Sequence, residues 1–209
     1  QDAQRAFERA MELRPDYSPA AYNLGNLLKT ANDLPGAIAA FEQAVRGDPN
    51  DVRSVANLGD VLLRSGRKQE ALPQFLRATL LAPKDLIPQY NLARTALELN
   101  LPELALPAAQ RAALLDPQGC FGNWVLADAL MAQPTVDTSA ARIAAAAADT
   151  HNRGNDPSVR LSLAKAMLAC GERTAAIALL NATTTDQRFA GHKNLADIQQ
   201  ELQSLRAAK

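Results

Sequence analysis

Three asparagines recur at a constant spacing of 34 residues, at Asn23, Asn57 and Asn91. A carboxamide offers one acceptor oxygen and two donor hydrogens, so it can pair with both the C=O and the N–H of a peptide bond, whatever side chain that peptide carries. Each such bond adds only about 0.5–1.5 kcal/mol net, so several of them would have to act together with apolar contacts. The spacing therefore predicts sequence-tolerant binding of a polypeptide backbone. The alternative is that these amides satisfy neighbouring backbone groups inside the repeats.

Patterns typical of enzymes are missing from the sequence. It has only two histidines and no HExxH, GxSxG, GxxxxGK[ST] or GxGxxG motif. Asp149, His151 and Asp156 could be drawn as a metal site, but we expect them in a solvated loop, which lacks the fixed geometry that a metal needs. We therefore predict a protein that is not an enzyme, with no catalytic residues, no cofactor and no metal.

The composition limits the partners. Lys plus Arg number 22 and Asp plus Glu number 22, so no long-range field attracts nucleic acid or an anionic membrane surface. The apolar stretches fall short of the roughly 20 residues that span a bilayer. Cys120 and Cys170 lie 50 residues apart without a CxxC pair, so we expect free thiols. The sequence predicts a soluble protein with no nucleic-acid partner and no membrane insertion. No leader is visible, which favours the cytoplasm, but the chain opens on Gln1 and a processed N-terminus stays open.

The 34-residue period extends to the elements that must position the asparagines. Pro15, Pro49, Pro83 and Pro117 follow it, and each comes after a helical pattern that it helps to end. The residues ahead of each proline stand at i, i+4 and i+7 on one helix face: Ala3, Phe7, Ala10; Ala37, Phe41, Ala44; Ala71, Phe75, Ala78; Ala105, Ala109, Ala112. After each proline comes a leucine with a small residue: Leu24-Gly25, Leu58-Gly59, Leu92-Ala93 and Leu126-Ala127. Small residues let two helix backbones approach closely, so the period predicts a two-helix solenoid.

At these residues the chain resembles the tetratricopeptide repeat family, whose 34-residue pattern carries Leu-Gly, Ala, Phe and Pro. The resemblance implies an all-α fold, a right-handed superhelical solenoid of helix-turn-helix repeats with a C-terminal capping helix. It covers nearly the whole chain as a single solenoid, 1–209. The expected boundaries are 1–17 for the second half of a truncated repeat, 18–51, 52–85, 86–119, about 120–156 and about 157–186 for repeats, and 187–207 for the capping helix.

Two irregularities interrupt the period. Pro117 and Pro157 are 40 residues apart, six more than the period, and we expect the excess within 150–158 rather than in the AQPTVDTS segment before it. Pro73 and Pro107 are again 34 apart, and we expect both in the first turn of a helix, where the missing amide costs least.

Residues 1–14 match only the second half of a repeat. Without a partner helix, Phe7 would present an apolar face to water, so we expect that the chain was cut from a longer protein with further repeats upstream. A genuine N-terminus with one unpaired helix is the alternative. The same face gives a route to self-association with the terminal repeat of a second copy.

In tetratricopeptide superhelices the first helix of each repeat lines a concave groove, and the resemblance implies the same here. Positions 2, 5, 6, 9, 12 and 13 of each unit then point inward, Lys29 among them. The residues that we predict to bind a peptide are Tyr22, Asn23, Asn26, Arg53, Asn57, Asp60, Arg64, Tyr90, Asn91, Arg94, Phe121 and Trp124. Backbone binding is expected within 18–100, with apolar anchoring or a different contact beyond it.

Two functions within the family are compared with these residues. Domains that clamp the acidic C-terminus of heat-shock chaperones need two asparagines and three cations; Asn26 and Asn57 match, but Tyr22, Ile87 and Asn91 replace the cations, so this function is disfavoured. The asparagine ladder is similar to the superhelix of O-linked N-acetylglucosamine transferases. Our leading hypothesis is a protein–protein interaction scaffold that binds a peptide or protein segment in its groove. The alternative is the substrate-recognition portion of a larger transferase, whose catalytic domain is not in these 209 residues.

Overall fold

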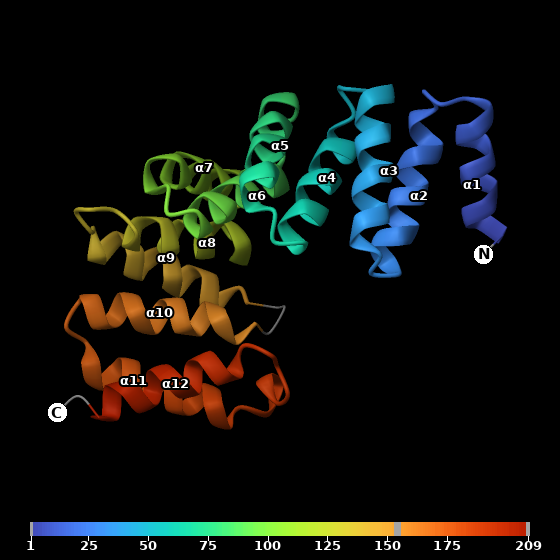
Figure 1. Cartoon of the computed structure of the whole chain (residues 1–209). Coiled ribbons are helices and arrows are strands. Elements are labelled where there is room, and N and C mark those ends of the chain that lie inside the picture. Colours follow the sequence, from blue (N-terminus) through green and yellow to red (C-terminus); the bar gives the residue numbers. More distant parts are fainter. Residues whose placement is uncertain (1, 153–155, 208–209) are drawn as a thin grey trace. The chain divides into compact units, whose positions relative to one another are not determined.

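The fold is all-α, as the sequence predicts. A computed structural model describes residues 2–152 and 156–207, and within these ranges it contains twelve α-helices, one short 3-10 helix and no strand (Figure 1). The helices are α1 Asp2–Leu13, α2 Ser18–Thr30, α3 Leu34–Gly47, α4 Val52–Arg64, α5 Lys68–Leu81, α6 Leu86–Glu98, α7 Pro102–Leu115, α8 Cys120–Met131, α9 Thr138–Thr150, α10 Pro157–Ala169, α11 Arg173–Thr185 and α12 Leu195–Ala207; the 3-10 helix η1 is Gln187–Phe189.

The chain divides into two compact units, residues 1–99 and 100–209. In the first unit α2 packs on α3 and α4 on α5, while α3 on α4 and α5 on α6 join successive pairs. In the second unit α8 packs on α9 and α10 on α11, and α9 on α10 joins the pairs. Each unit is therefore a stack in which a helix packs on its neighbours in sequence, which is the arrangement of a solenoid.

The small residues of the first unit lie where helices approach most closely. A Cβ atom added at Gly25 would lie 2.8 Å from the Phe41 ring, and one added at Gly59 would lie 2.8 Å from the Phe75 ring. Both rings are fully buried. The sequence predicts a close approach of two helices at these glycines, and in the structure the phenylalanine ring of the next helix occupies the space that each glycine leaves.

The turns inside the helix pairs depend on a residue with positive φ. Asn32 (φ 61°), Gly66 (φ 81°) and Asn100 (φ 56°) hold this position at the 34-residue spacing. The next equivalent residue is Pro134, whose ring holds φ negative, so the same turn cannot form there. The connection between α8 and α9 accordingly extends over 132–137, where the earlier pair uses only 65–67.

The predicted excess of six residues within 150–158 is wrong. Pro157 is the first residue of α10, whereas Pro117 precedes α8, so the two prolines are not equivalent. Helices α8 and α10 begin 37 residues apart, at Cys120 and Pro157. Most of that smaller excess lies in the α8–α9 turn, because of Pro134. Residues 153–155 of the predicted segment lie outside the described residues.

The two prolines expected in a first helical turn lie in helix interiors instead. Pro73 stands inside α5 and Pro107 inside α7, each beyond the first turn. The residues four positions earlier, whose carbonyls lose a helical hydrogen-bond donor, are Gln69 and Glu103, and both are partly or fully exposed. Water can satisfy those carbonyls, which makes an interior proline tolerable here.

The C-terminal helix is shorter than predicted. Residues 187–189 form η1, and α12 begins only at Leu195. Between these two helices Gly191 has a positive φ of 76°, which is incompatible with a continuous right-handed helix. Ile198 and Leu202 of α12 are buried in a cluster with Leu180 of α11, while the opposite face is polar, as expected of a capping helix.

At the other end of the chain, α1 packs on α2 and contains no fully buried residue. Phe7 is half-buried, so less of its ring meets solvent than the sequence predicts.

Candidate functional site

A lysine joins the first two helix pairs on the predicted binding face. Lys29 of α2 donates from Nζ to Oδ1 of Asn57 at 2.5 Å and lies 3.4 Å from Oδ2 of Asp60, both on α4. The Lys29 side chain is 24% exposed and that of Asp60 41%, so the group is partly screened by solvent. This network fixes α2 against α4 and uses polar groups that sequence reasoning had assigned to a ligand.

An aromatic stack lies beside this network. Tyr22 of α2 meets Phe41 edge-on, with ring centroids 6.0 Å apart. The guanidinium of Arg53 covers the Tyr22 ring at 5.1 Å from its centroid. Asp51, which caps the start of α4, holds Arg53 through a 3.0 Å contact to Nε. Tyr22 and Arg53 therefore form one preassembled surface, with Arg53 exposed on top.

The three asparagines of the ladder differ in what they contact. The Asn57 carboxamide is already used, because its Oδ1 accepts from Lys29 and its Nδ2 donates to the backbone oxygen of Arg53 at 2.9 Å. Within the described residues the carboxamides of Asn23 and Asn91 make no hydrogen bond, and Asn23 is exposed while Asn91 is half-buried. The Asn57 carboxamide therefore bonds to neighbouring groups of the protein, which was the alternative interpretation. The carboxamides of Asn23 and Asn91 can still form hydrogen bonds with a ligand.

The remaining predicted residues of the first unit are also unequal. Asn26 is half-buried, and Arg64 is exposed and donates to Oδ1 of Asn32 at 3.2 Å. Tyr90 is only 8% exposed, and its hydroxyl lies 3.4 Å from Nη1 of Arg94. As it stands, Tyr90 offers a ligand little surface, whereas Arg94 is exposed. We leave out Asn57, which is internally bonded, and Tyr90, which is nearly buried, and call the other predicted residues of the first unit the polar face: Tyr22, Asn23, Asn26, Arg53, Asp60, Arg64, Asn91 and Arg94.

Phe121 and Trp124 lie in the second unit, where they line a cavity of 590 Å³. The loop before α8 contributes Asp116, Gln118 and Gly119, and α8 itself adds Cys120 with the two aromatic residues. The other wall consists of His151, Asn152, Asp156, Val159 and His192. We call this space the α8–α10 cavity. Its volume is in the range of pockets that bind small ligands or single peptide side chains.

The hydrogen bonds around the α8–α10 cavity fix several of its groups. Trp124 donates from Nε1 to Ser162 Oγ at 3.0 Å. His151 Nδ1 lies 2.8 Å from the carbonyl oxygen of Ala147 and must therefore carry a proton, whereas His192 Nδ1 accepts from the backbone amide of Asn194 at 3.3 Å. The two histidines are thus held in opposite tautomers when neutral.

The thiol of Cys120 is not a poised nucleophile. Burial, and then the negative charges of Asp156 and Asp149, raise the pKa of Cys120 to about 11. The protonated thiol is therefore the stable form near neutral pH, which fits a structural role. Cys120 and Cys170 are both free.

The residues drawn as a metal site in the sequence take other roles. Asp149 lies in α9 rather than in a loop, and its Oδ1 contacts Nε of Arg160 at 3.1 Å. Asp156 caps α10 by accepting from the backbone amide of Ser158 at 2.9 Å. Across the ranges 2–152 and 156–207, no three His, Cys, Asp or Glu side chains gather as a metal site would require.

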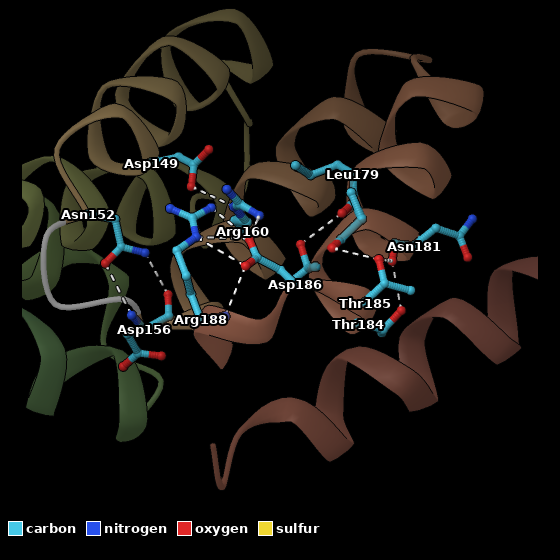
Figure 2. A network of polar contacts seen from close by, with 12 residues as sticks. Asp149, Asn152, Asp156, Arg160, Leu179, Asn181, Thr184, Thr185, Asp186 and Arg188 are labelled. Carbon is cyan, nitrogen blue, oxygen red and sulfur yellow. Dashed lines mark hydrogen bonds and ion pairs between the residues drawn. The ribbon is translucent and has the colours of Figure 1, made fainter. Parts of the chain in front are cut away.

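An ionic network contains Asp149, Arg160, Asp186 and Arg188 (Figure 2). Arg160 of α10 contacts Asp149 and also Asp186 Oδ2, at 3.4 Å, and its guanidinium lies 5.0 Å from the Phe189 ring centroid. Arg188 binds Asp186 from another side, with Nη2 2.6 Å from Oδ2. Hydrogen bonds from the Arg188 side chain and backbone, together with both positive charges, hold the pKa of Asp186 at about 2. The network ties α9 and α10 to the segment that follows α11.

Sequence reasoning missed most of the cavity. Its walls come from residues 116, 118–121, 124, 151, 152, 156, 159 and 192, which share no period and no motif. Only Phe121 and Trp124 could be predicted from the sequence. They stand at positions of the 34-residue repeat that were expected to face the groove, as Tyr22 does in the first full repeat. Lys29, whose position was predicted to face the groove, hydrogen-bonds to Asn57 of the next repeat, so its ammonium group is already engaged within the protein.

The geometry and the register agree with comparison to known sequences. The family model for the tetratricopeptide repeat matches residues 1–52, 22–89 and 56–120, which together cover more than half of the chain. The chain belongs to the tetratricopeptide repeat family. No curated protein matches it.

Solved structures of other proteins, two of them described as tetratricopeptide repeat (TPR) proteins, have a similar fold. YrrB, described as a TPR protein with an unusual peptide-binding site, is 20% identical, with a TM-score of 0.70 over 93% of this chain and 98% of its own. TTC0263, a thermophilic TPR protein of Thermus thermophilus, is 17% identical, with a TM-score of 0.66 over 91% and 99%. PilF of Pseudomonas aeruginosa is 19% identical, with a TM-score of 0.72 over 96% and 90%. At these identities the likeness concerns the fold. Within the described ranges, no helix is both long and apolar enough to cross a membrane.

Proposed function

We propose that this TPR protein is an interaction scaffold whose polar face binds an extended segment of a partner protein. The observation that carries the proposal is the state of Asn23 and Asn91, which hold the ladder register and make no hydrogen bond within the described residues. An amide with unused donors and an unused acceptor at the surface can pair with a peptide backbone. Asn57 contributes less in this scheme, because Lys29 and Arg53 already occupy its carboxamide.

The surroundings of these asparagines suit a polypeptide. Tyr22 under Arg53 offers a flat, preassembled contact, and Tyr and Arg are the residue types that carry most energy at protein interfaces. Asp60, Arg64 and Arg94 give the polar face charges of both signs, which fits a partner recognised by its arrangement of charges rather than by its net charge. YrrB, a protein of similar fold, is described as having a peptide-binding site, which gives the proposal a precedent within the fold.

The test is the affinity of a peptide selected on the intact chain from a random peptide library. In the double variant Asn23→Ala, Asn91→Ala, loss of two or more hydrogen bonds of about 0.5–1.5 kcal/mol each predicts a Kd raised about 5- to 100-fold. Asn50→Ala is the matched control, because Asn50 is exposed in the α3–α4 loop and outside the polar face. An unchanged Kd in the double variant, or an equal loss in the control, contradicts the proposal.

A further inference from the structure

We infer that the α8–α10 cavity is a receptor for a basic side chain, arginine above all, of the bound partner. The inference rests on the proposed function, since the partner is taken to be a polypeptide. It differs from the apolar anchoring expected of Phe121 and Trp124 and specifies the different contact that was the alternative there. The cavity's size, its aromatic wall and its charge carry the argument.

Two aromatic side chains, Phe121 and Trp124, form part of the cavity lining. Phe121 is 50% exposed, and the Trp124 indole is held in place by its bond to Ser162. Aromatic faces attract cations through the ring quadrupole, and Trp does so more strongly than Tyr or Phe. An arginine side chain combines an apolar stem with a planar guanidinium that stacks on such faces, so it suits a 590 Å³ space of this lining.

The charge of the lining points the same way. Asp116 and Asp156 contribute carboxylates, and no Lys or Arg is among the lining residues that the structure describes. Arg160, a cation on α10, is engaged by Asp149 and Asp186. The raised pKa of the Cys120 thiol, due first to burial and then to Asp156 and Asp149, reflects the same negative surroundings.

The two carboxylates are not equally engaged. Asp156 already caps α10 and accepts a 3.4 Å contact from Asn194 Nδ2. The half-buried Asp116 carboxylate makes no hydrogen bond within 2–152 and 156–207. It lies over Gly119, where an added Cβ would stand 1.7 Å from its Oδ2. The missing side chain at Gly119 thus lets the Asp116 carboxylate lie beside the cavity.

These features discriminate between occupants. An apolar side chain would exclude solvent from Asp116 and leave that carboxylate without a partner, which is unfavourable. An acidic side chain would meet two like charges. A guanidinium pairs with the carboxylates and stacks on Phe121 or Trp124 at the same time, with hydrogen bonds of the strong, charge-assisted kind.

The chain contains a direct reporter of this cavity, because Trp124 is its single tryptophan. The probe is the peptide acetyl-Gly-Ser-Arg-Ser-Gly-amide, titrated into the full chain while tryptophan emission is followed. We expect a saturable change with a Kd on the order of 1 mM, as for a single anchored side chain. Peptides with citrulline, which keeps the shape but not the charge, or with norleucine should bind at least about ten-fold more weakly.

Two sets of variants assign the signal to the cavity. Asp116→Asn with Asp156→Asn should weaken the arginine peptide about ten-fold, while Asn at 156 still caps α10 and circular dichroism melting verifies the fold. Gly119→Ala, which displaces the Asp116 carboxylate without removing its charge, should weaken it as well. Equal binding of the citrulline or norleucine peptide, no saturable change, or unchanged binding in the aspartate variant overturns the inference.

The outcome is separable from that of the proposed function. Asn23→Ala, Asn91→Ala should leave the arginine-peptide titration unchanged, because neither residue lines the cavity. If the library-selected peptide still loses affinity in that variant while the arginine peptide fails to bind, only the cavity inference falls. If the arginine peptide binds and the asparagine variant changes nothing, only the polar-face proposal falls.

Discussion

The two units of this TPR protein use their helix pairs in different ways. In residues 1–99 the polar side chains on α2 and α4 bind one another across repeats, and Lys29 with Asn57 is the clearest case. In residues 100–209 the corresponding register positions open onto a cavity lined by aromatic and acidic groups. Where the repeats are regular, polar side chains of adjacent repeats contact one another and form a continuous surface. Where the repeats depart from the period, a cavity remains between the helices. The predictions below test how far this contrast holds.

The largest effect should come from the contacts between glycine and phenylalanine in the first unit. Phe75→Ala removes a fully buried ring opposite Gly59 and should lower the free energy of unfolding by about 3–5 kcal/mol. Hydrogen exchange should show lost protection mainly in α4 and α5, since a repeat stack loosens locally. Leu180→Ala is the counterpart in the second unit, and its loss should appear in α10 to α12. Uniform loss over both units in either variant would refute separate units.

The second prediction compares the ionic networks. Arg160→Met leaves Asp149 and Asp186 without their shared partner, in a site where the Arg160 side chain is 17% exposed, and should destabilise by about 2–3 kcal/mol in urea unfolding. Lys29→Met breaks a more exposed pair and should cost less than about 1 kcal/mol. Similar decreases in the free energy of unfolding for the two variants would show that the network around Arg160 contributes no more to stability than the more exposed one around Lys29.

The third prediction concerns the internally bonded asparagine. Asn57→Ala removes the bonds with Lys29 and Arg53 and should lower stability by about 1 kcal/mol, whereas Asn91→Ala should change it by less than about 0.5 kcal/mol. For the selected peptide the order should reverse, with Asn91→Ala weakening binding more. Thermal melting and isothermal titration on the same preparations measure the two orders. If the same variant caused the larger loss of both stability and peptide affinity, the two asparagines would not have the different roles that we assign to them.

The smallest effect is a pH dependence of the second unit. Contacts from Arg188 hold the pKa of Asp186 at about 2, below its ordinary 3.8, so this carboxylate stabilises the fold above about pH 4 and the contribution is lost as the pH falls toward 2. The urea midpoint of Asp186→Asn should therefore fall less steeply than that of the parent between about pH 5 and about pH 3. Glu103→Gln removes the same charge from an exposed residue of α7 and serves as the control. Identical slopes for all three proteins would contradict the assignment.

The repeat register accounts for what the sequence could predict. Prolines, alanine–phenylalanine faces and Leu-Gly pairs at a period of 34 were sufficient to predict the all-α repeat fold. They also predicted a close approach of helices at the glycines, but not that phenylalanine rings would fill the space there. They failed at Pro134 and Pro157, because a single proline changed the turn and another began a helix rather than ending one. Local chemistry competes with the period at such points.

The candidate site was less predictable because register says which way a residue points but not what it meets. Asn57 and Asn91 share a position, yet only Asn57 lies within reach of Lys29. Tyr90 shares its position with Tyr22 and is nearly covered. The cavity combines residues as far as 76 positions apart, Asp116 and His192, that no periodic pattern relates. Contacts between repeats of unequal length have no signature in one sequence.

The Lys29 bridge has a consequence for how the first repeats respond to a ligand. Its ammonium is shared by two acceptors of the next helix pair, so a partner group that takes either acceptor weakens the joint between α2 and α4. By reciprocity, whatever loosens that joint exposes those acceptors to the partner. Binding of a partner to the polar face and the stiffness of the joint between α2 and α4 are thus thermodynamically coupled through one side chain.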